Sequence, residues 1–595
     1  MKSKRKNGQS GSTILLVMGI MTVLSVMVGV AWEYTMTVSR NVQRGNRLET
    51  GIGIADGVLE TQFVHWREIC RIHTNSAMPT STMRDIPLPT QAQFPDITSF
   101  TAKAGNQADM SDEYDSNYTV SNVKVVAVDP QLNALVDAST TPPPTTGMSA
   151  DTQIYNYVAS ADVTMPALKG NVVARVRRVF QKKQQSPWTW AIFYADPLEI
   201  HPGPAFTVTG PVHTNSDLFT GHNTLTFADK VTFARDWIVG FMPGDTTHPE
   251  TPTRPISAPG LPPALDVAQQ PFGLDANRIF TDPTNPNQTN KYHELVEEKV
   301  PGYTDPLAGG RYVDQACIQF YIDGGNNIRI VLRDGTVVNT SSTMYSTLAG
   351  LITTNQTIQD NRELASIRLA SLDVSKLVTA LNAPGNTVGL AGLSWNGIIY
   401  IKDTSNATGT RRGIRIKNAS VVPTNGLTIA SANPVYVQGD FNTGSNPPSN
   451  SGDPTKPQGT GYTRQPCSIL ADAVNVLSNT WNDANSFAGT SSRVAANTTV
   501  NAALISGIVP TGGGNYSGGV ENFPRFLEDW TGKTLTYYGS MVELYPSDQS
   551  NGTWGKANVY GAPLRRWYFD NNFKLAAPPG SLMIFSYIKG KWSVL

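Results

Sequence analysis

The sequence predicts an α+β protein in which one long N-terminal helix, transmembrane at first and amphipathic afterwards, precedes a mainly-β body. Three observations predict this fold class. Residues 12–32 carry no charge, and helical spacing of apolar residues continues beyond them to about residue 72. The rest of the chain is rich in turn formers, with 51 Gly and 40 Pro among 595 residues. A β-solenoid is the favoured form of this body, and a β-sandwich is the alternative.

Charge in this chain is sparse and balanced. Charged residues make up 15% of it, 46 basic against 46 acidic. Proteins that bind nucleic acids need clustered Lys and Arg for the phosphates, so we expect no nucleic-acid partner. Cys70, Cys317 and Cys467 lie far apart and form no CxxC pair. Neither a zinc site nor a dense disulfide framework is therefore indicated.

The head of the chain has the pattern of a membrane-spanning segment. Four basic residues precede the apolar run, Lys2, Lys4, Arg5 and Lys6. This asymmetry keeps the N-terminus in the cytoplasm and sends the remainder across the membrane. Ser12 to Trp32 would form about 31 Å of helix, which matches a hydrocarbon core of ~30 Å. No A-x-A-like site follows the run, as a conventional secretory signal would require, so a simple one-span anchor is the plainest interpretation.

The helical pattern continues past the membrane segment. Apolar residues recur at helical spacing among charged ones at Tyr34, Val38, Val42, Leu48, Ile52, Ile54, Val58, Leu59 and Phe63. No proline appears before Pro79. Gly45, Gly51, Gly53 and Gly57 weaken such a helix by up to ~1 kcal/mol each, but none need end it. We therefore expect a transmembrane and stalk helix over residues 12–78.

Two stretches, QSGSTILLVMGIMTVLSVMVG (residues 9–29) and RLETGIGIADGVLE (47–60), resemble the start of PilX-like minor pilins. These belong to the type IV pilin and type II secretion pseudopilin superfamily. The resemblance implies that prepilin peptidase removes a leader, residues 1–11, by cutting between Gly11 and Ser12. It also implies that the helix then leaves the inner membrane and packs among other pilins or pseudopilins in a filament.

Leu16 departs from that family's pattern. Major pilins carry Glu at the fifth residue after the cleaved glycine, where its carboxylate is thought to pair with the freed amine of a neighbouring subunit. An unpaired charge in a dry filament core is costly, so this pairing favours assembly. A chain with Leu16 cannot make it, which favours a minor, tip-type subunit over a bulk one. Asp56 stands where the family's second block usually has Glu.

The remainder divides by composition into four parts. Residues 79–116 are rich in Pro, Thr, Asp and Ser and are predicted to form a linker. Residues 117–185 have stretches that alternate between apolar and polar residues and are predicted to form a small β-rich domain. Residues 186–450 have short apolar segments separated by Gly, Asn and Asp, which is typical of a β-solenoid. A Pro-rich insertion interrupts them at 243–312. Residues 451–595 form a C-terminal β-rich region.

The body offers few candidates for chemistry. His213, Asp217 and His222 share the segment HTNSDLFTGH, but no metal-ligand spacing is recognisable, and solvated turn residues explain them better. His293 and Glu294 match the first two positions of the zinc-binding motif HExxH. Position 297 is Glu instead of the second His, so the motif is incomplete. Asp483 in WNDAN lacks the rest of a calcium loop and fits a turn cap. We therefore expect no catalytic residue, cofactor or metal.

The sequence thus predicts a minor pilin or pseudopilin-like protein, not an enzyme. Its body is expected in the periplasm or outside the cell, for assembly, adhesion or contact with a surface or secreted ligand. One alternative is a permanently membrane-anchored surface protein that binds carbohydrate or protein. Another is a polysaccharide-active β-solenoid enzyme, which would have to gather the residues Asp440, Asp472, Asp483, Arg411, Arg412 and Arg415 in space.

Overall fold

A computed structural model describes most of the chain outside its longest polar segments. The described residues are 10–75, 118–133, 152–167, 170–221, 225–245, 263–268, 270–271, 291–299, 301–302, 307, 309–384, 387–404, 411–444, 464–555 and 558–595. The predicted linker 79–116 lies outside them, as does most of the Pro-rich insertion.

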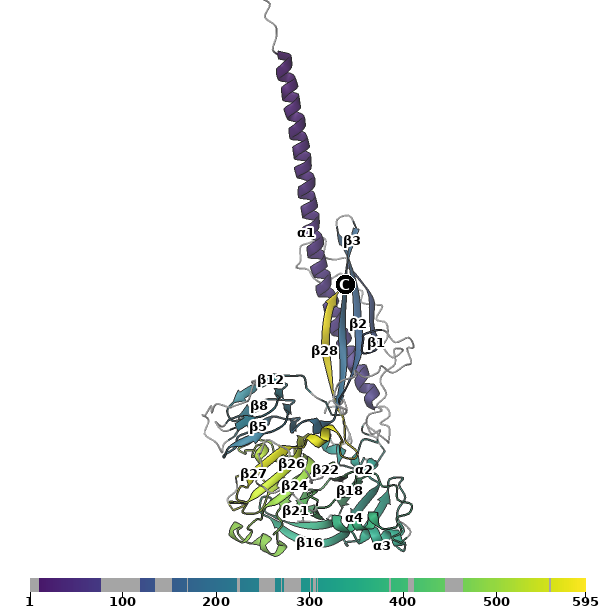
Figure 1. Ribbon diagram of the computed structural model, residues 1–595, viewed down its shortest axis with the longest axis vertical. Helices are drawn as coiled ribbons and strands as arrows, with labels where there is room; N and C mark the ends of the chain where they lie inside the picture. Colours follow the sequence, from purple (N-terminus) through teal and green to yellow (C-terminus); the bar gives the residue numbers. More distant parts are fainter. Residues whose placement is uncertain are drawn as a thin grey trace, which may run out of the picture.

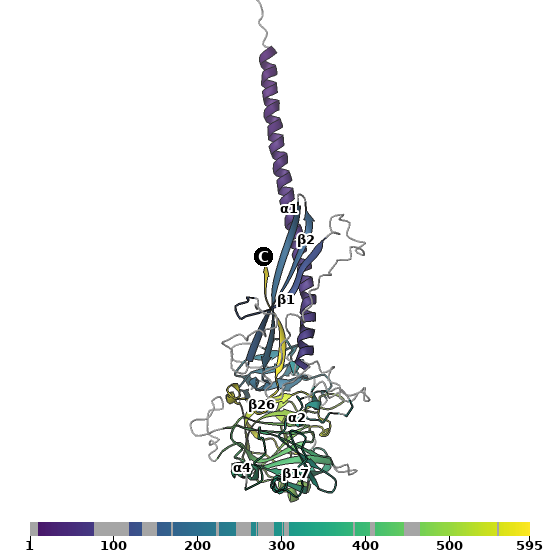
Figure 2. The ribbon, with the colours of Figure 1, turned by 90° about the vertical axis from the view of Figure 1, so that its right-hand side faces the viewer.

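Helix α1 (Ser10–Asn75) is one continuous element. It runs well past the rest of the molecule, and the β-rich body lies at its opposite end (Figures 1 and 2). The prediction of a long N-terminal helix followed by a β-rich body is confirmed. Residues 76–78 of the predicted helix are not among the described ones.

A sheet covers the C-terminal half of α1, and we call the two together the stalk. Its strand order is β1-β2-β3-β28-β13, and every neighbouring pair is antiparallel. The strands are β1 (Thr119–Val128), β2 (Thr152–Ala167), β3 (Gly170–Gln185), β28 (Ile584–Val594) and β13 (Gln270–Pro271). Alternate side chains of these strands face the helix, as the period of two in a strand requires.

The contact between helix and sheet is apolar and tightly packed. Residues of α1 spaced three or four apart form one face, with Ala55, Leu59, Phe63, Trp66 and Cys70 all buried. Trp66 is fully buried, and its ring lies 5.3 Å from those of both Tyr157 and Phe180. This face explains why the helix stays regular beyond the membrane segment despite its glycines.

Gly51 marks the point where α1 comes closest to the sheet. A Cβ at this position would lie 2.9 Å from Cβ of Ala174, whereas one at Gly53 meets nothing within 4 Å. We expect Gly51→Ala to destabilise the stalk, because overpacking typically costs about 1–3 kcal/mol and the gain in helix propensity is at most ~1 kcal/mol. Gly53→Ala is the matched control and should stabilise the helix by up to ~1 kcal/mol. Thermal unfolding of both variants, compared with wild type, measures the difference; equal shifts would contradict this packing.

The body begins with short strands of two or three residues. They are β4 (Ile192–Tyr194), β5 (Leu198–Ile200), β6 (Phe206–Val208), β7 (Val212–Thr214), β8 (Leu218–Thr220), β9 (Leu225–Phe227), β10 (Val231–Phe233), β11 (Trp237–Val239) and β12 (Ala264–Leu265). Their partners are parallel: β4 pairs with β7 and β7 with β10, while β5 pairs with β8 and β8 with β11.

Longer strands make up the rest of the body. They are β14 (Ile318–Ile322), β15 (Ile328–Leu332), β16 (Ile352–Asp360), β17 (Ala365–Asp373), β18 (Ile398–Asp403), β19 (Arg411–Ala419), β20 (Leu427–Ser431), β21 (Val435–Phe441), β22 (Cys467–Ala471), β23 (Val474–Leu477), β24 (Thr498–Ser506), β25 (Arg525–Phe526), β26 (Thr534–Glu543) and β27 (Leu564–Phe569). Helices α2 (Tyr312–Gln315), α3 (Thr343–Ala349) and α4 (Val374–Asn382) lie among them, as do short 3-10 helices, including Lys291–Leu295.

One parallel ladder runs through the whole body, in the order β14-β18-β20-β22-β24-β26-β4-β7-β10-β12. Its inward residues stack in register as a column, Ile318, Ile399, Ile429, Ile469, Leu504, Met541, Ile192, Val212 and Val231. All of them belong to the largest buried cluster. Burial of such side chains at roughly 1.5–3 kcal/mol each is the main stabilising contribution in this part of the fold.

The route of the chain through this ladder is not sequential. It enters at β4, moves outward to β12, and then continues at the far end with β14. From there it returns through β24 to β26, which pairs with β4. The last strand, β28, then pairs with β3, Gln185 opposite Ile584. The body is therefore inserted between two adjacent strands of the stalk sheet.

Candidate functional site

The N-terminal part of α1 is the most unusual surface of the molecule. Its apolar side chains are exposed all around the helix; Ile14 is 62% exposed and Trp32 69% exposed. Among the described residues, α1 is the one helix long and apolar enough to cross a membrane, with a mean hydropathy of 2.6 in its best window. A soluble monomer rarely leaves so large an apolar patch uncovered. This segment therefore requires a non-aqueous surrounding, either lipid or protein.

Three threonine hydroxyls in the N-terminal half of α1 are satisfied within the helix. The hydroxyls of Thr22, Thr35 and Thr37 donate to the carbonyl oxygens of Met18, Ala31 and Glu33 at 2.7–2.8 Å. Such bonds to the preceding turn leave these donors with no need of water. The segment can thus lie in lipid or against apolar side chains without an unsatisfied hydroxyl at those three positions.

The structure places the proposed processing residues at the free end of α1. The helix begins at Ser10, so Gly11 and Ser12 lie in its first turn, and Ser12 is exposed. Leu16 follows one turn later and is 64% exposed. Residues 1–9, which include the basic head, are not among the described ones.

Charged residues dock the second half of α1 onto the stalk sheet. Arg178 on β3 donates to Glu60 at 2.8 Å and lies 3.5 Å from Asp56. Lys589 on β28 also pairs with Glu60, and these contacts hold the pKa of Glu60 below its usual value. Asp56 and Glu60 both lie in the block 47–60 singled out from the sequence, so that block attaches the helix to the sheet.

The segment HTNSDLFTGH does not form an open site at its first histidine. His213 is fully buried, with Nδ1 2.8 Å from the hydroxyl of Thr232 and Nε2 3.1 Å from Oδ1 of Asn215. Burial lowers its pKa to about 4, so it is neutral at physiological pH. Asp217 accepts from the backbone of Asp236, and His222 lies outside the described residues.

The dispersed acidic residues of the body are each engaged separately. Asp483 pairs with Arg415 at 2.6 Å, in a short helix capped by Asn482. Asp440 accepts from the backbone of Thr499 at 2.8 Å. Arg411 pairs with Glu363, and Arg412 lies 3.7 Å from Asp403. In the part of the chain that is described, no three His, Cys, Asp or Glu side chains gather as metal ligands.

His293 holds the segment 291–299 against the body. Its Nε2 lies 3.1 Å from Asp472 and its Nδ1 3.2 Å from Glu297, with Asp548 at 3.6 Å. Burial alone lowers the pKa of His293, but the hydrogen bonds and charges of these carboxylates outweigh it and raise the pKa to about 10. His293 in turn holds the pKa values of Asp472 and Glu297 below their usual range.

This cluster makes stability depend on pH in two directions. Because the pKa of His293 is raised, its contribution is complete below pH ~6.5 and is lost as pH rises toward 10. Asp472 and Glu297 contribute above their ordinary values near 4, and that contribution is lost as pH falls below them. We expect the melting temperature of wild type to fall between about pH 6.5 and 9, and His293→Gln to flatten this slope. An unchanged slope in the variant would show that His293 does not carry it.

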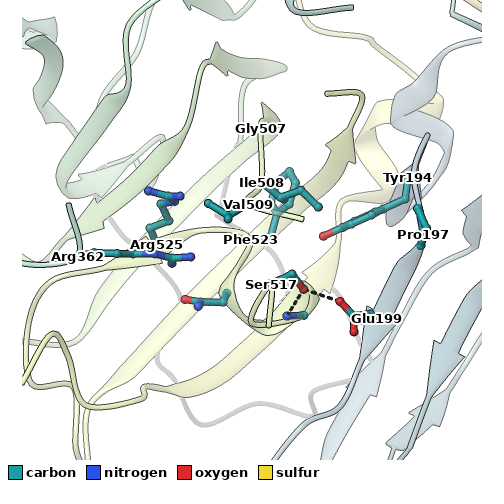
Figure 3. Close-up of a pocket in the computed structure, with 12 residues that line it drawn as sticks. Tyr194, Pro197, Glu199, Arg362, Gly507, Ile508, Val509, Ser517, Phe523 and Arg525 are labelled. Carbon is teal, nitrogen blue, oxygen red and sulfur yellow. Dashed lines mark hydrogen bonds between the residues drawn. The ribbon is translucent and has the colours of Figure 1, made fainter. Parts of the chain in front are cut away.

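A small cavity lies between the strands β4 and β5 and the segment that follows β24 (Figure 3). Its volume is about 10 Å³, which is enough for one water molecule. Glu199 reaches this cavity and accepts a hydrogen bond from Ser517 at 2.7 Å. Arg362 and Arg525 line its other side. The cavity is too small for an organic substrate, but Arg362 also lines a larger pocket, described below.

The sequence did not indicate the close packing of α1 at Gly51, nor the pocket that Arg362 lines in the body. Gly51 is not distinguished in the sequence from Gly45, Gly53 and Gly57, and only the position of Ala174 sets it apart. Arg362 lies far along the chain from the residues with which it forms a pocket, Thr553, Trp554, Gly555, Val559, Tyr560 and Ala562. No short motif marks either one.

Comparison with known proteins does not identify a family for this chain. No protein-family model matches the chain, and no curated protein does. Among solved structures, the competence-associated pilin ComZ from Thermus thermophilus aligns over 93% of this chain and 97% of its own. Its identity is 10% and its TM-score 0.24, values at which the likeness establishes neither a shared fold nor a shared function.

Proposed function

We propose that this chain is a minor pilin or pseudopilin-like component of a type IV pilus or type II secretion filament. The observation that carries the proposal is the bare apolar surface of α1 between Ser12 and Trp32, continuous with a helix packed on a sheet. Bilayer lipid would cover this surface before assembly, and the helices of other pilins or pseudopilins after it. The chain would lie in the bacterial inner membrane with its N-terminus cytoplasmic.

In this proposal prepilin peptidase cuts between Gly11 and Ser12 and removes residues 1–11. The position of these residues at the free end of an exposed helix supports access to them. Leu16 offers no carboxylate to a neighbouring amine, which supports a tip or low-abundance place in the filament over a bulk one. The body would be displayed for assembly, adhesion or substrate contact, with no catalysis assigned to it.

We further propose that the body is a parallel β-solenoid and not a β-sandwich. The parallel ladder from β14 to β12 and its column of stacked aliphatic residues support this interpretation. Sandwiches of the usual kind are built from antiparallel sheets. A solenoid would give the displayed part a rigid, extended shape.

Shearing filaments from cells tests the filament proposal. We expect the chain to co-purify with sheared filaments, and Gly11→Asp to keep the precursor mass and stay with the inner membrane. Ser10→Ala, next to the cut, is the matched control and should be processed normally. A permanently anchored surface protein would give the opposite result, with wild type and Gly11→Asp both retained in the membrane fraction.

A further inference from the structure

A pocket in the body is separate from every residue that the filament proposal uses. Its volume is about 250 Å³, and it is lined by Arg362, Thr553, Trp554, Gly555, Val559, Tyr560 and Ala562. We call it the arginine pocket. Arg362 comes from the turn between β16 and β17, and the other residues come from the loop between β26 and β27.

The guanidinium of Arg362 is held in a fixed position. The side chain of Asp360 accepts from the backbone N–H groups of Arg362 (2.9 Å) and Glu363 (3.0 Å), which fixes the turn. Nε of Arg362 donates to the carbonyl oxygen of Gly552 at 2.8 Å. With its amide oxygen turned toward them, Asn522 accepts from Nη1 of Arg362 at 3.2 Å and from the Trp554 indole at 2.9 Å. A donor fixed in this way binds a ligand with little loss of conformational entropy.

Arg362 is the one charged residue among the described residues that line this pocket. Glu363, the nearest acidic neighbour in sequence, pairs with both Arg411 and Arg525. Burial, and then the charge of Arg525, lower the pKa of Arg362 to about 9. The lining residues that are described include one guanidinium and no carboxylate. A negatively charged group in the pocket would therefore stabilise the charged form of the buried Arg362.

The remaining walls are aromatic and apolar. The single indole N–H of Trp554 is shared between the amide oxygen of Asn522 and the hydroxyl oxygen of Tyr560, 3.0 Å away, so the phenol keeps its own proton to donate. Trp554 is supported edge-on by Tyr516, with ring centroids 5.1 Å apart. Flat aromatic walls with a few convergent donors are typical of sites for small ring-shaped ligands.

We propose that the arginine pocket binds a carboxylate carried on a six-membered ring. The carboxylate would accept from Arg362 and from the hydroxyl of Tyr560, and the ring would pack against Trp554 and Val559. The two sources of this chemistry are the sugar acids of acidic polysaccharides and free aromatic acids. This inference does not depend on the fate of the N-terminal helix, since a chain that never enters a filament would still have the pocket.

Calorimetric titration of the purified full-length chain in detergent tests the proposal. The probes are trigalacturonate, its methyl ester and benzoate. We expect at least one of the two acids to bind, and the ester to bind roughly tenfold or more weakly than trigalacturonate if that acid is the ligand. Tight binding of trigalacturonate points to a polysaccharide, and preference for benzoate points to an aromatic acid. Binding of neither acid, or equal binding of trigalacturonate and its ester without any benzoate binding, would overturn the proposal.

Variants separate binding in this pocket from binding elsewhere. Arg362→Gln should weaken acid binding roughly tenfold or more, and Tyr560→Phe several-fold, because each removes one donor to the carboxylate. Tyr560→Phe changes one hydroxyl and keeps the wall, so it remains informative if Arg362→Gln fails to fold. The matched control is Tyr345→Phe, which removes a hydroxyl bound to the Ile328 carbonyl at 2.8 Å, away from the pocket, and should leave affinity unchanged. Acid binding that is unaffected by Tyr560→Phe and by a folded Arg362→Gln would contradict the assignment.

Discussion

Replacing Trp66 by alanine is expected to separate the stalk helix from its sheet. Trp66 is fully buried, and its ring contacts those of Phe63, Tyr157, Phe180 and Tyr587. Removing a buried tryptophan typically costs about 3–5 kcal/mol, because the lost transfer free energy is joined by that of a cavity. The loss falls on the helix–sheet contact, since these aromatic partners come from β2, β3, β28 and the helix itself.

Hydrogen exchange of the helix amides around residues 55–70 measures this loss locally. In Trp66→Ala these amides should exchange faster by roughly two to three orders of magnitude, while amides of the body stay near wild type. Val64→Ala is the control, because Val64 is exposed on the opposite side and should change stability by less than about 0.5 kcal/mol. Unchanged exchange in Trp66→Ala would mean that the helix does not depend on this contact.

Removing the carboxylate of Asp570 is expected to have an effect of similar size in the body. Asp570 accepts two hydrogen bonds from Arg464, both 2.8 Å long, and both side chains are almost fully buried. Arg464 also lies over the ring of Tyr538, with its guanidinium carbon 4.5 Å from the centroid. Removing one partner of a buried ion pair typically lowers the free energy of unfolding by about 3–5 kcal/mol, because the remaining charge is left without a partner in an environment that excludes water.

Exchange of the β26 and β27 amides measures the effect of Asp570→Ala. Asp570 also caps the short helix Asn571–Lys574. Asp570→Asn keeps an oxygen that can accept the capping hydrogen bond, so this variant measures the loss of the charge without the loss of the cap. The comparison pair is Asp162 with Arg175 in the stalk, 3.6 Å apart with Arg175 largely exposed. Asp162→Ala should cost less than about 1 kcal/mol. Equal losses at the two positions would contradict the role of burial.

Local patterns in the sequence were enough to predict α1, because a helix is defined by contacts between neighbours in the chain. The uncharged run corresponds to an exposed segment of the helix. The apolar spacing beyond it corresponds to a buried face at Val58, Leu59 and Phe63, whereas its earlier members, Tyr34, Val38, Val42 and Leu48, are exposed. Short strands were also expected in the body from its turn-rich composition. Each of these signals lies within a few residues of the element that it predicts.

Pairings between distant segments could not be predicted. β3 and β28 are separated by nearly the whole body, and nothing local in Gln185 or Ile584 indicates that they face each other. The same holds for β4 and β26, which join the first and last strands of the ladder. Such contacts depend on the three-dimensional path of the chain. The arginine pocket was missed for the same reason.

The insertion of the body between β3 and β28 has a mechanical consequence for the proposed filament. The chain passes from β3 into the body and returns at the adjacent strand β28. β13, from within the inserted part, also pairs with β28, so force on the body passes into the stalk sheet at each of these strands. The sheet in turn is held to α1 by the Trp66 contacts and by the pairs of Arg178 and Lys589 with Glu60. An extended body displayed at a filament tip would need such a connection.

The mass of the N-terminal peptide of the wild-type chain, isolated from its own cell envelope, tests the central claim most directly. We expect the peptide to begin at Ser12, with its amine methylated, in the filament fraction. A chain that still begins at Met1 in every fraction would contradict it, and the apolar helix would then be a permanent anchor.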